Sequence, residues 1–193
     1  MQHLTIQGIR IPKAENIKDV LTLIRSDFSR YGCKLSLAFL YKNYGFRYTC
    51  LYRICNYLKS GLIYHILFLL KMKLQKKYSL VIPNHTNIGY GIFFHHADGV
   101  IVNGSAIIGD NVNFHQFSTI GADEGKAAVI GNNCFIGPGV CIVENIKIGD
   151  NVVIGAGAVC VKDIPSDVTV GGVPAKIISH NNSERLIHNK YII

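Results

Sequence analysis

Residues 130–160 read IGNNCFIGPGVCIVENIKIGDNVVIGAGAVC, and a six-residue period runs through the whole stretch. An aliphatic residue or a cysteine opens each hexad, and glycine often follows it. These first places are Ile130, Ile136, Ile142, Ile148, Ile154 and Cys160. A hexapeptide period is typical of a parallel β-helix, whose coils bury the repeated aliphatic residues.

The same period begins earlier in the chain and shifts its phase twice. Its earlier first places are Ile82, Ile88, Phe94 and Val100, and then, two residues out of phase, Val102, Ile108, Phe114 and Ile120. A second shift, of four residues, falls in residues 122–129 (ADEGKAAV), where we expect a short loop that leaves the coil. With three hexads to a coil, the sequence predicts a mainly β chain with a parallel β-helix of about four coils.

The first 80 residues predict an α-helical region instead. One apolar stripe at helical spacing joins Ile17, Val20, Leu21, Ile24 and Phe28. Further apolar segments without proline cover residues 34–43, 47–59 and 62–77, so we expect three or four helices. The expected division is therefore a helical N-terminal region (1–80), a β-helix domain (81–179) and a C-terminal tail (180–193).

Charge divides the chain at the same place. Residues 1–80 hold 14 Lys and Arg against 3 Asp and Glu, whereas residues 81–193 hold 6 against 9. The excess of +11 in the first part suits a phosphate-rich partner such as a membrane surface, and it also fits solvated helix faces. No recognition motif accompanies the aromatic residues there, so we expect no nucleic-acid partner.

Composition predicts a folded chain in a reducing compartment. Of the 193 residues, 49% are hydrophobic, which excludes a disordered chain. None of the six cysteines forms a C-x-x-C pair, and the start MQHLTIQGIRIPK lacks the apolar core of a signal peptide. The apolar run at residues 62–70 is too short to span a bilayer. We therefore expect a cytoplasmic protein, with contact to the inner face of the membrane as a further hypothesis.

The period also predicts which side chains meet between coils. Phe94 and Phe114 are one coil apart, so their rings are expected to stack. His95 should then lie beside His115, and His96 beside Gln116. The sequence thus predicts a polar cluster on one side of the coils.

Two segments carry a resemblance to a known family. They are IGYGIFFHHADGVIVNGSAIIGDNVNFHQFSTIG (88–121) and IGAGAVCVKDIPSDVTVGGVPAKII (154–178). The hexads resemble the left-handed β-helix acyltransferases, and residues 46–178 resemble the serine acetyltransferase branch in particular. The resemblance implies acetyl transfer from acetyl-CoA to a hydroxyl, and a homotrimer with active sites between subunits. It implies no metal.

The resemblance also assigns site residues. His96 takes the place of the catalytic histidine, and an imidazole can accept the proton of an attacking hydroxyl. Gly121 and Ala122 match a Gly-Gly turn whose N–H groups can stabilise an oxyanion. Cofactor-binding places are matched by Ala122, Pro138, Gly139, Gly155, Ala156 and Lys162. The substrate-binding places are expected at His95, Asp98, His115 and Gln116.

Several positions depart from the serine acetyltransferase pattern. His95 replaces an Asp that holds the ammonium of serine, and Lys126 and Ala127 replace an Arg-His pair. Val81 replaces the Asp that orients the catalytic imidazole, for which four substitutes stay open. These are Asp98, His95, Asn84 and His85.

The departures argue against free serine as the acceptor. The His-His pair is similar to that of acetyltransferases from bacterial exopolysaccharide clusters. The main prediction is therefore an acetyl-CoA-dependent O-acetyltransferase that modifies a sugar hydroxyl in bacterial surface polysaccharide biosynthesis.

Three alternatives remain. The first is a serine O-acetyltransferase of cysteine biosynthesis. The second is a γ-carbonic-anhydrase-like lyase, which needs three convergent histidine ligands that the histidine spacing here does not suggest. The third is a non-catalytic scaffold.

Overall fold

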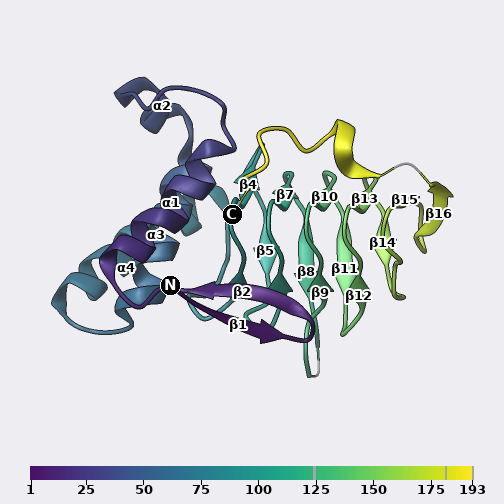
Figure 1. Cartoon of the computed structure of the whole chain (residues 1–193), viewed down its shortest axis with the longest axis horizontal. Coiled ribbons are helices and arrows are strands. Elements are labelled where there is room, and N and C mark those ends of the chain that lie inside the picture. Colours follow the sequence, from purple (N-terminus) through teal and green to yellow (C-terminus); the bar gives the residue numbers. More distant parts are fainter. Residues whose placement is uncertain (124, 181, 193) are drawn as a thin grey trace.

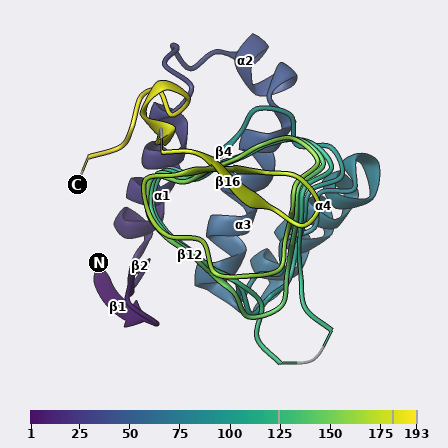
Figure 2. The same ribbon diagram turned by 90° about the vertical axis from the view of Figure 1, so that its right-hand side faces the viewer.

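The computed structural model describes residues 1–123, 125–180 and 182–192. A left-handed β-helix forms most of the molecule, and four helices gather at the end where its first coil lies (Figure 1). The β-helix has about four coils. Their strands stack into three sheets, one for each face of a triangular cross-section, which Figure 2 shows end-on. This confirms the predicted fold class.

Each face of the β-helix collects one strand from every coil. The first face contains β4 (Phe93–Phe94), β7 (Asn113–Phe114), β10 (Phe135–Ile136), β13 (Val153–Ile154), β15 (Thr169–Gly171) and the antiparallel β16 (Lys176–Ser179). The second contains β5 (Ile101–Val102), β8 (Thr119–Gly121), β11 (Cys141–Val143) and β14 (Val159–Cys160). The third contains β3 (Asn87–Ile88), β6 (Ile107–Ile108), β9 (Val129–Ile130) and β12 (Lys147–Ile148).

The hexad first places form the core, as predicted. Ile136 pairs with Phe114 on one side and with Ile154 on the other, and all three side chains are buried. The rings of Phe94 and Phe114 stack with centroids 5.6 Å apart. The stacking of the coils continues across the second phase shift, since Ile108 pairs with Ile130. The loop between β8 and β9 leaves the coil there (Figure 2). Residue 124 of that loop lies outside the described residues.

Asparagines hold one corner of consecutive coils. Asn111, Asn133 and Asn151 have φ of 56°, 54° and 58°, in the left-handed region that Asn tolerates better than most residues. Their amides form a ladder, with Nδ2 to Oδ1 distances of 3.3 Å from Asn111 to Asn133 and 3.1 Å from Asn133 to Asn151. The ladder satisfies polar groups at the turn and fixes the stacking of the coils.

The C-terminal tail, which had no role predicted for it, runs back along this corner toward the helices (Figure 1). The Ser183 N–H donates to the Asn151 carbonyl at 3.0 Å, after which the 3₁₀ helix η1 (Ser183–Arg185) begins. Further on, the Tyr191 N–H donates to Asn111 Oδ1 at 2.8 Å. The tail therefore joins the last coils to the first.

The helices are α1 (Ile17–Ser29), α2 (Leu37–Lys42), α3 (Tyr44–Leu58) and α4 (Leu62–Tyr78), which confirms the predicted helices. The packed face of α1 is not the predicted stripe, because Ile17 and Leu21 are exposed and Ser26 and Asp27 are buried. None of the described helices is both long enough and apolar enough to cross a bilayer.

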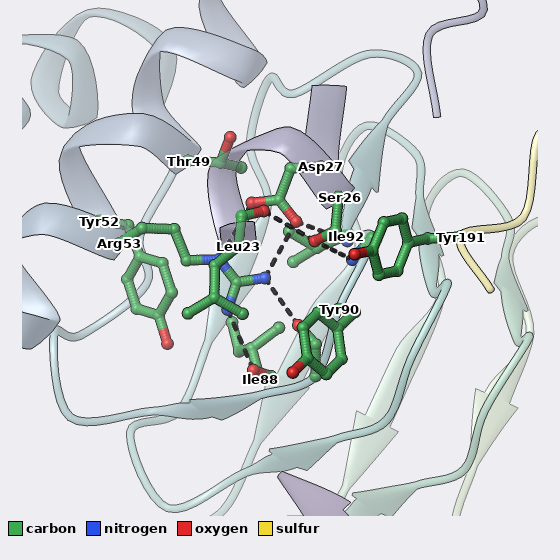
Figure 3. A network of polar contacts seen from close by, with 12 residues as sticks. Leu23, Ser26, Asp27, Thr49, Tyr52, Arg53, Ile88, Tyr90, Ile92 and Tyr191 are labelled. Carbon is green, nitrogen blue, oxygen red and sulfur yellow. Dashed lines mark hydrogen bonds and ion pairs between the residues drawn. The ribbon is translucent and has the colours of Figure 1, made fainter. Parts of the chain in front are cut away.

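A buried ion pair explains the inward polar face of α1 (Figure 3). Arg53 of α3 binds both carboxylate oxygens of Asp27 at 3.0 Å, and its remaining N–H groups donate to the carbonyls of Ile88 and Gly89. Asp27 also accepts the Ile92 N–H at 3.0 Å. Burial raises the pKa of Asp27, whereas the charge of Arg53 opposes that shift. The pair thus fastens two helices to the first coil.

A β-hairpin precedes the helices and was not predicted. Strands β1 (Gln2–Ile6) and β2 (Ile9–Lys13) pair antiparallel around Gln7 and Gly8, whose φ values are 49° and 89°. Two positive φ values in a two-residue loop are the geometry of a tight hairpin turn. The hairpin buries Ile11 against β6 and β9. The signal in the sequence was the Gln-Gly pair between two short alternating runs, which the helical reading of this region passed over.

Candidate active site

Three histidines lie together where β4 and β7 end. The rings of His95 and His115 stack with centroids 5.2 Å apart, which confirms that these side chains meet between coils. His96 meets His95 edge-on at 4.8 Å, and both of these side chains are exposed. The predicted contact between His96 and Gln116 stays a prediction. An exposed imidazole beside two others suits proton transfer to or from a ligand.

His115 is half-buried and has one ring nitrogen engaged. Its Nδ1 lies 3.1 Å from the Ile136 carbonyl, so Nδ1 is the atom that donates. The neutral ring then keeps Nε2 as an acceptor. Burial lowers the pKa of His115, and the neighbouring His95 and His96 lower it further. Although the three histidines lie close together, no group of three His, Cys, Asp or Glu side chains among the described residues has an arrangement that could hold a metal ion.

Asp98, two residues after His96, is held by the helical layer. Tyr44 at the start of α3 donates its hydroxyl to Asp98 Oδ2, and its ring stacks on Tyr78 with centroids 3.8 Å apart. Burial, followed by the charge and hydrogen bond of Asp98, raises the pKa of Tyr44 to about 12. Tyr44 was not predicted as a site residue, because nothing in its helical context indicates a contact with the β-helix.

Pro138, Gly139, Gly155 and Ala156, for which the sequence analysis predicts cofactor binding, follow the same corner of the coils away from the histidines. Gly99, Gly139 and Gly157 occupy equivalent turns with φ of 66°, 67° and 68°. A Cβ at Gly157 would have no neighbour within 4 Å, and one at Gly139 would meet Gly157 only at 3.9 Å. The backbone is therefore open to a ligand here. An extended pantetheine arm fits such a bare corner.

Phe117 is the exception among these equivalent turns of successive coils. It occupies the turn between Gly99 and Gly139 with φ of 60°, and its side chain is 65% exposed. A bulky residue in the left-handed region is uncommon and marks a position to inspect. Its ring covers Gly99, where a Cβ would come within 2.5 Å of Cδ1. The hexad pattern gave no sign of Phe117, since it lies between two inward places.

Gly121, Ala122 and Lys162 are not brought to the histidines within one chain. Gly121 ends β8, four residues beyond the corner at Phe117, which corresponds to about 13 Å of extended strand. Lys162 follows β14 on the same far edge and is exposed. These residues can join the histidines only across an interface between chains. Gly121 itself is open, since the nearest atom to a Cβ there would be Thr119 Cγ2 at 3.8 Å.

Two of the four candidates for orienting His96, Asn84 and His85, lie outside the histidine cluster. Asn84 Oδ1 accepts from Lys71 Nζ, and Asn84 and His85 both line a cavity of about 650 Å³ between the hairpin, the helices and the first coil. Val81 is paired with Ile101 by its backbone. His95 is left in contact with the ring of His96, and Asp98 is left close to it in sequence.

Comparisons with known proteins agree with this architecture. Residues 127–162 match the family model "Bacterial transferase hexapeptide (six repeats)". A serine acetyltransferase from Buchnera aphidicola of Schizaphis graminum is 34% identical over 152 residues, which are 76% of this chain and 58% of that protein. The soybean serine acetyltransferase complexed with serine superposes with a TM-score of 0.69 at 30% identity, covering 82% of this chain and 68% of that one. A serine acetyltransferase in complex with CoA gives a TM-score of 0.69 at 28% identity, covering 82% and 68%.

The fold, the hexads and these similarities place the chain among the hexapeptide-repeat transferases with a left-handed β-helix. Within that class it belongs to the serine acetyltransferase-like branch. The chain spans about half the length of the curated relatives it matches.

The predicted sugar acceptor and role in surface polysaccharide biosynthesis are wrong. The relatives and the solved neighbours are consistently serine acetyltransferases. The prediction relied on changes at His95, Lys126 and Ala127, but loss of a side chain identifies no other acceptor. In the structure Lys126 is exposed and Ala127 is buried, both in the loop between β8 and β9.

Proposed function

We propose that this chain is an acetyl-CoA-dependent serine O-acetyltransferase. The observation that carries the proposal is the exposed His96 in a three-histidine cluster, at the end of an open glycine-lined corner. The similarity to serine acetyltransferases over three quarters of the chain supports L-serine as the acceptor.

In the proposed reaction, the imidazole of His96 accepts the proton of the serine hydroxyl as its oxygen attacks the thioester carbonyl. The tetrahedral oxyanion accepts hydrogen bonds from backbone N–H groups, for which Gly121 and Ala122 of a neighbouring chain are proposed. Collapse of the intermediate breaks the carbon–sulfur bond. The imidazolium of His96 then returns the proton to the departing CoA sulfur, so the products are O-acetylserine and CoA.

The pantetheine arm of acetyl-CoA is proposed to lie along Pro138, Gly139, Gly155 and Ala156. Its amides can hydrogen-bond to an exposed backbone in the manner of an added strand. Lys162 is proposed as a contact for the CoA phosphates. The open space at Gly139 supports this course, since any side chain there would stand in the groove.

The acceptor is proposed to bind His95, Asp98, His115 and Gln116. Asp98 is the carboxylate nearest in sequence to His96, and we assign it to the serine ammonium in place of the missing Asp at position 95. His115 Nε2 and Gln116 then face the hydroxyl or the carboxylate. Gln116 Oε1 is buried and has no hydrogen-bond partner among the described residues, so its side chain has spare capacity for a ligand.

A homotrimer is proposed as the active assembly. The separation of Gly121 from His96 supports it, because a neighbouring chain must complete the site. A cytoplasmic location suits the acetyl-CoA supply, and contact with a membrane surface stays a separate hypothesis.

The decisive measurement is thiol release from acetyl-CoA with L-serine, using the wild type, His96→Ala and His180→Ala. His180 is exposed and distant from the cluster in sequence, so its variant is the matched control. We expect His96→Ala to lose about 100-fold or more in rate and His180→Ala to lose nothing. Full activity in His96→Ala would reject the assigned base. Turnover by the wild type with other hydroxyl compounds but not with L-serine would reject the acceptor.

A further inference from the structure

Helix α4 exposes an apolar face that no described part of the chain covers. Its first nine residues include large aliphatic side chains that are 45–77% exposed. These are Leu62, Ile63, Ile66, Leu69 and Leu70. At 100° per residue, they fall within one arc of the helix. The next turns of the same arc expose Lys73, Lys76 and Lys77.

The opposite face of α4 fixes this orientation. It packs on α3 and buries Lys71, whose Nζ donates to the Ile82 carbonyl and to Asn84 Oδ1, both at 2.5 Å. The ammonium also lies 5.2 Å from the ring centre of Tyr48. Rotating the aliphatic side chains inward would break these contacts and leave the buried cation unpaired. The helix therefore holds a cation inside and its aliphatic face outside.

Charge around this face has one sign. Residues 28–97 hold ten Lys and Arg and no Asp or Glu. Lys59, which lines the cavity beside the hairpin, precedes α4 in the sequence, and the three exposed lysines follow the aliphatic turns on the same arc of the helix. A matching partner offers apolar contact and negative charge together. A bilayer containing anionic lipid has both, and basic amphipathic helices bind such a surface in its plane.

A second α4 helix fits this face less well. Pairing two α4 helices in parallel would place the lysines of one against those of the other. Antiparallel pairing would place Lys73, Lys76 and Lys77 over aliphatic side chains. Either arrangement leaves cations without acidic partners, which costs binding free energy.

We propose that α4 is a peripheral anchor, which lays Leu62, Ile66 and Leu69 into the surface of an anionic membrane while the flanking lysines bind lipid phosphates. The proposal is independent of the acetyl acceptor. In this arrangement α4 lies in the plane of the membrane surface.

Sedimentation with vesicles tests the proposal. The full chain is mixed with vesicles of phosphatidylcholine alone or with phosphatidylserine added. The variant Leu62→Asn/Ile66→Asn/Leu69→Asn removes the aliphatic contact, and Leu37→Asn/Tyr41→Asn on α2 is the control, since those side chains are 86% and 82% exposed. We expect binding only to the anionic vesicles, lowered about tenfold or more in the α4 variant and unchanged in the α2 variant.

Further readouts separate this result from misfolding and self-association. The α4 variant should have the circular dichroism spectrum and the activity of the wild type, because the three substituted residues are remote from the histidines. Lys73→Gln/Lys76→Gln/Lys77→Gln must weaken binding and reduce its salt dependence. Absence of wild-type binding to anionic vesicles would overturn the proposal. So would light scattering that shows α4 to be an interface between copies, with a lower mass in the α4 variant.

Discussion

The β-helix and the helical layer are stabilised in different ways. In the β-helix each inward position has the same kind of neighbour on both sides, as Ile136 has Phe114 and Ile154. In the helical layer single contacts that do not repeat hold the elements, such as Asp27 with Arg53. A local change in the coils therefore removes one of many similar contacts, whereas a change in the helical layer can remove the only one.

The largest effect is expected for Arg53→Met. It leaves Asp27 buried and without its cation, and removing one partner of a buried pair typically costs about 3–5 kcal/mol. Urea unfolding of the wild type and the variant measures the loss. The double variant Arg53→Met/Asp27→Leu should recover part of it, because no unpaired charge remains. Equal stability of Arg53→Met and the wild type would contradict the view that this pair fastens the helices.

The next effect is expected in the coils, for Ile136→Ala. The side chain is fully buried, and its removal leaves a cavity between two stacked neighbours, at a typical cost of about 2–4 kcal/mol. Val143→Ala, on the same coil but half-buried, is the control and should cost less than about 1 kcal/mol. The same unfolding measurement decides. A larger loss for Ile136→Ala than for Arg53→Met would reverse the proposed difference between the two regions.

These two regions also differ in how much of them could be predicted. In a repeat, equivalent positions have the same environment in every coil. The hexads were therefore enough to predict the stacking of Phe94 on Phe114 and of His95 on His115. The helices were predicted from apolar spacing, but spacing cannot show that Asp27 would face inward, because its partner is 26 residues away. The hairpin was missed since its strands are short and its turn signal is a single Gln-Gly pair.

The candidate site divides in the same way. The alignment of the corner residues along the β-helix was predictable, since equivalent turns recur in every coil. Tyr44 and Phe117 were not, because one comes from outside the repeat and the other breaks it. Gly121 and Lys162 lie on another edge, and the chain-to-chain contact that would unite them with His96 leaves no periodic signal in the sequence.

A smaller loss of stability should distinguish a glycine at a corner of a coil from a glycine at the end of a strand. Gly157 has φ of 68° and nothing within 4 Å of a Cβ, so Gly157→Ala tests the backbone conformation alone. The expected cost is about 1–2 kcal/mol, that of a left-handed non-glycine residue. Gly121→Ala is the control, since Gly121 lies outside the left-handed region and its Cβ would contact only Thr119, so its stability should not change. Equal losses in the two variants would show that the left-handed φ of Gly157 is not the cause of its loss.

The smallest effect concerns the pH dependence of stability. Burial lowers the pKa of Lys71 to about 8, whereas lysine in an unfolded chain titrates near 10.4. Between these values the unfolded chain holds a proton that the folded chain releases, so Lys71 makes stability rise with pH across this window. Its contacts to two oxygens and a ring favour the charged form, so we expect the rise to reach only about 1 kcal/mol.

The thiols of Cys50 and Cys134 act in the opposite direction. Burial raises the pKa of both to about 12, so their contribution to stability is lost as pH rises above the value near 8.5 at which unfolded cysteine ionises. The effect of Lys71 must therefore be taken as a difference between the wild type and Lys71→Met, measured by urea unfolding from pH 7.5 to 9.5. The stability of the wild type relative to the variant should increase with pH. A difference that stays constant would mean that Lys71 keeps its charge in the folded chain, so that an ammonium makes the hydrogen bonds to Ile82 and Asn84 throughout this range.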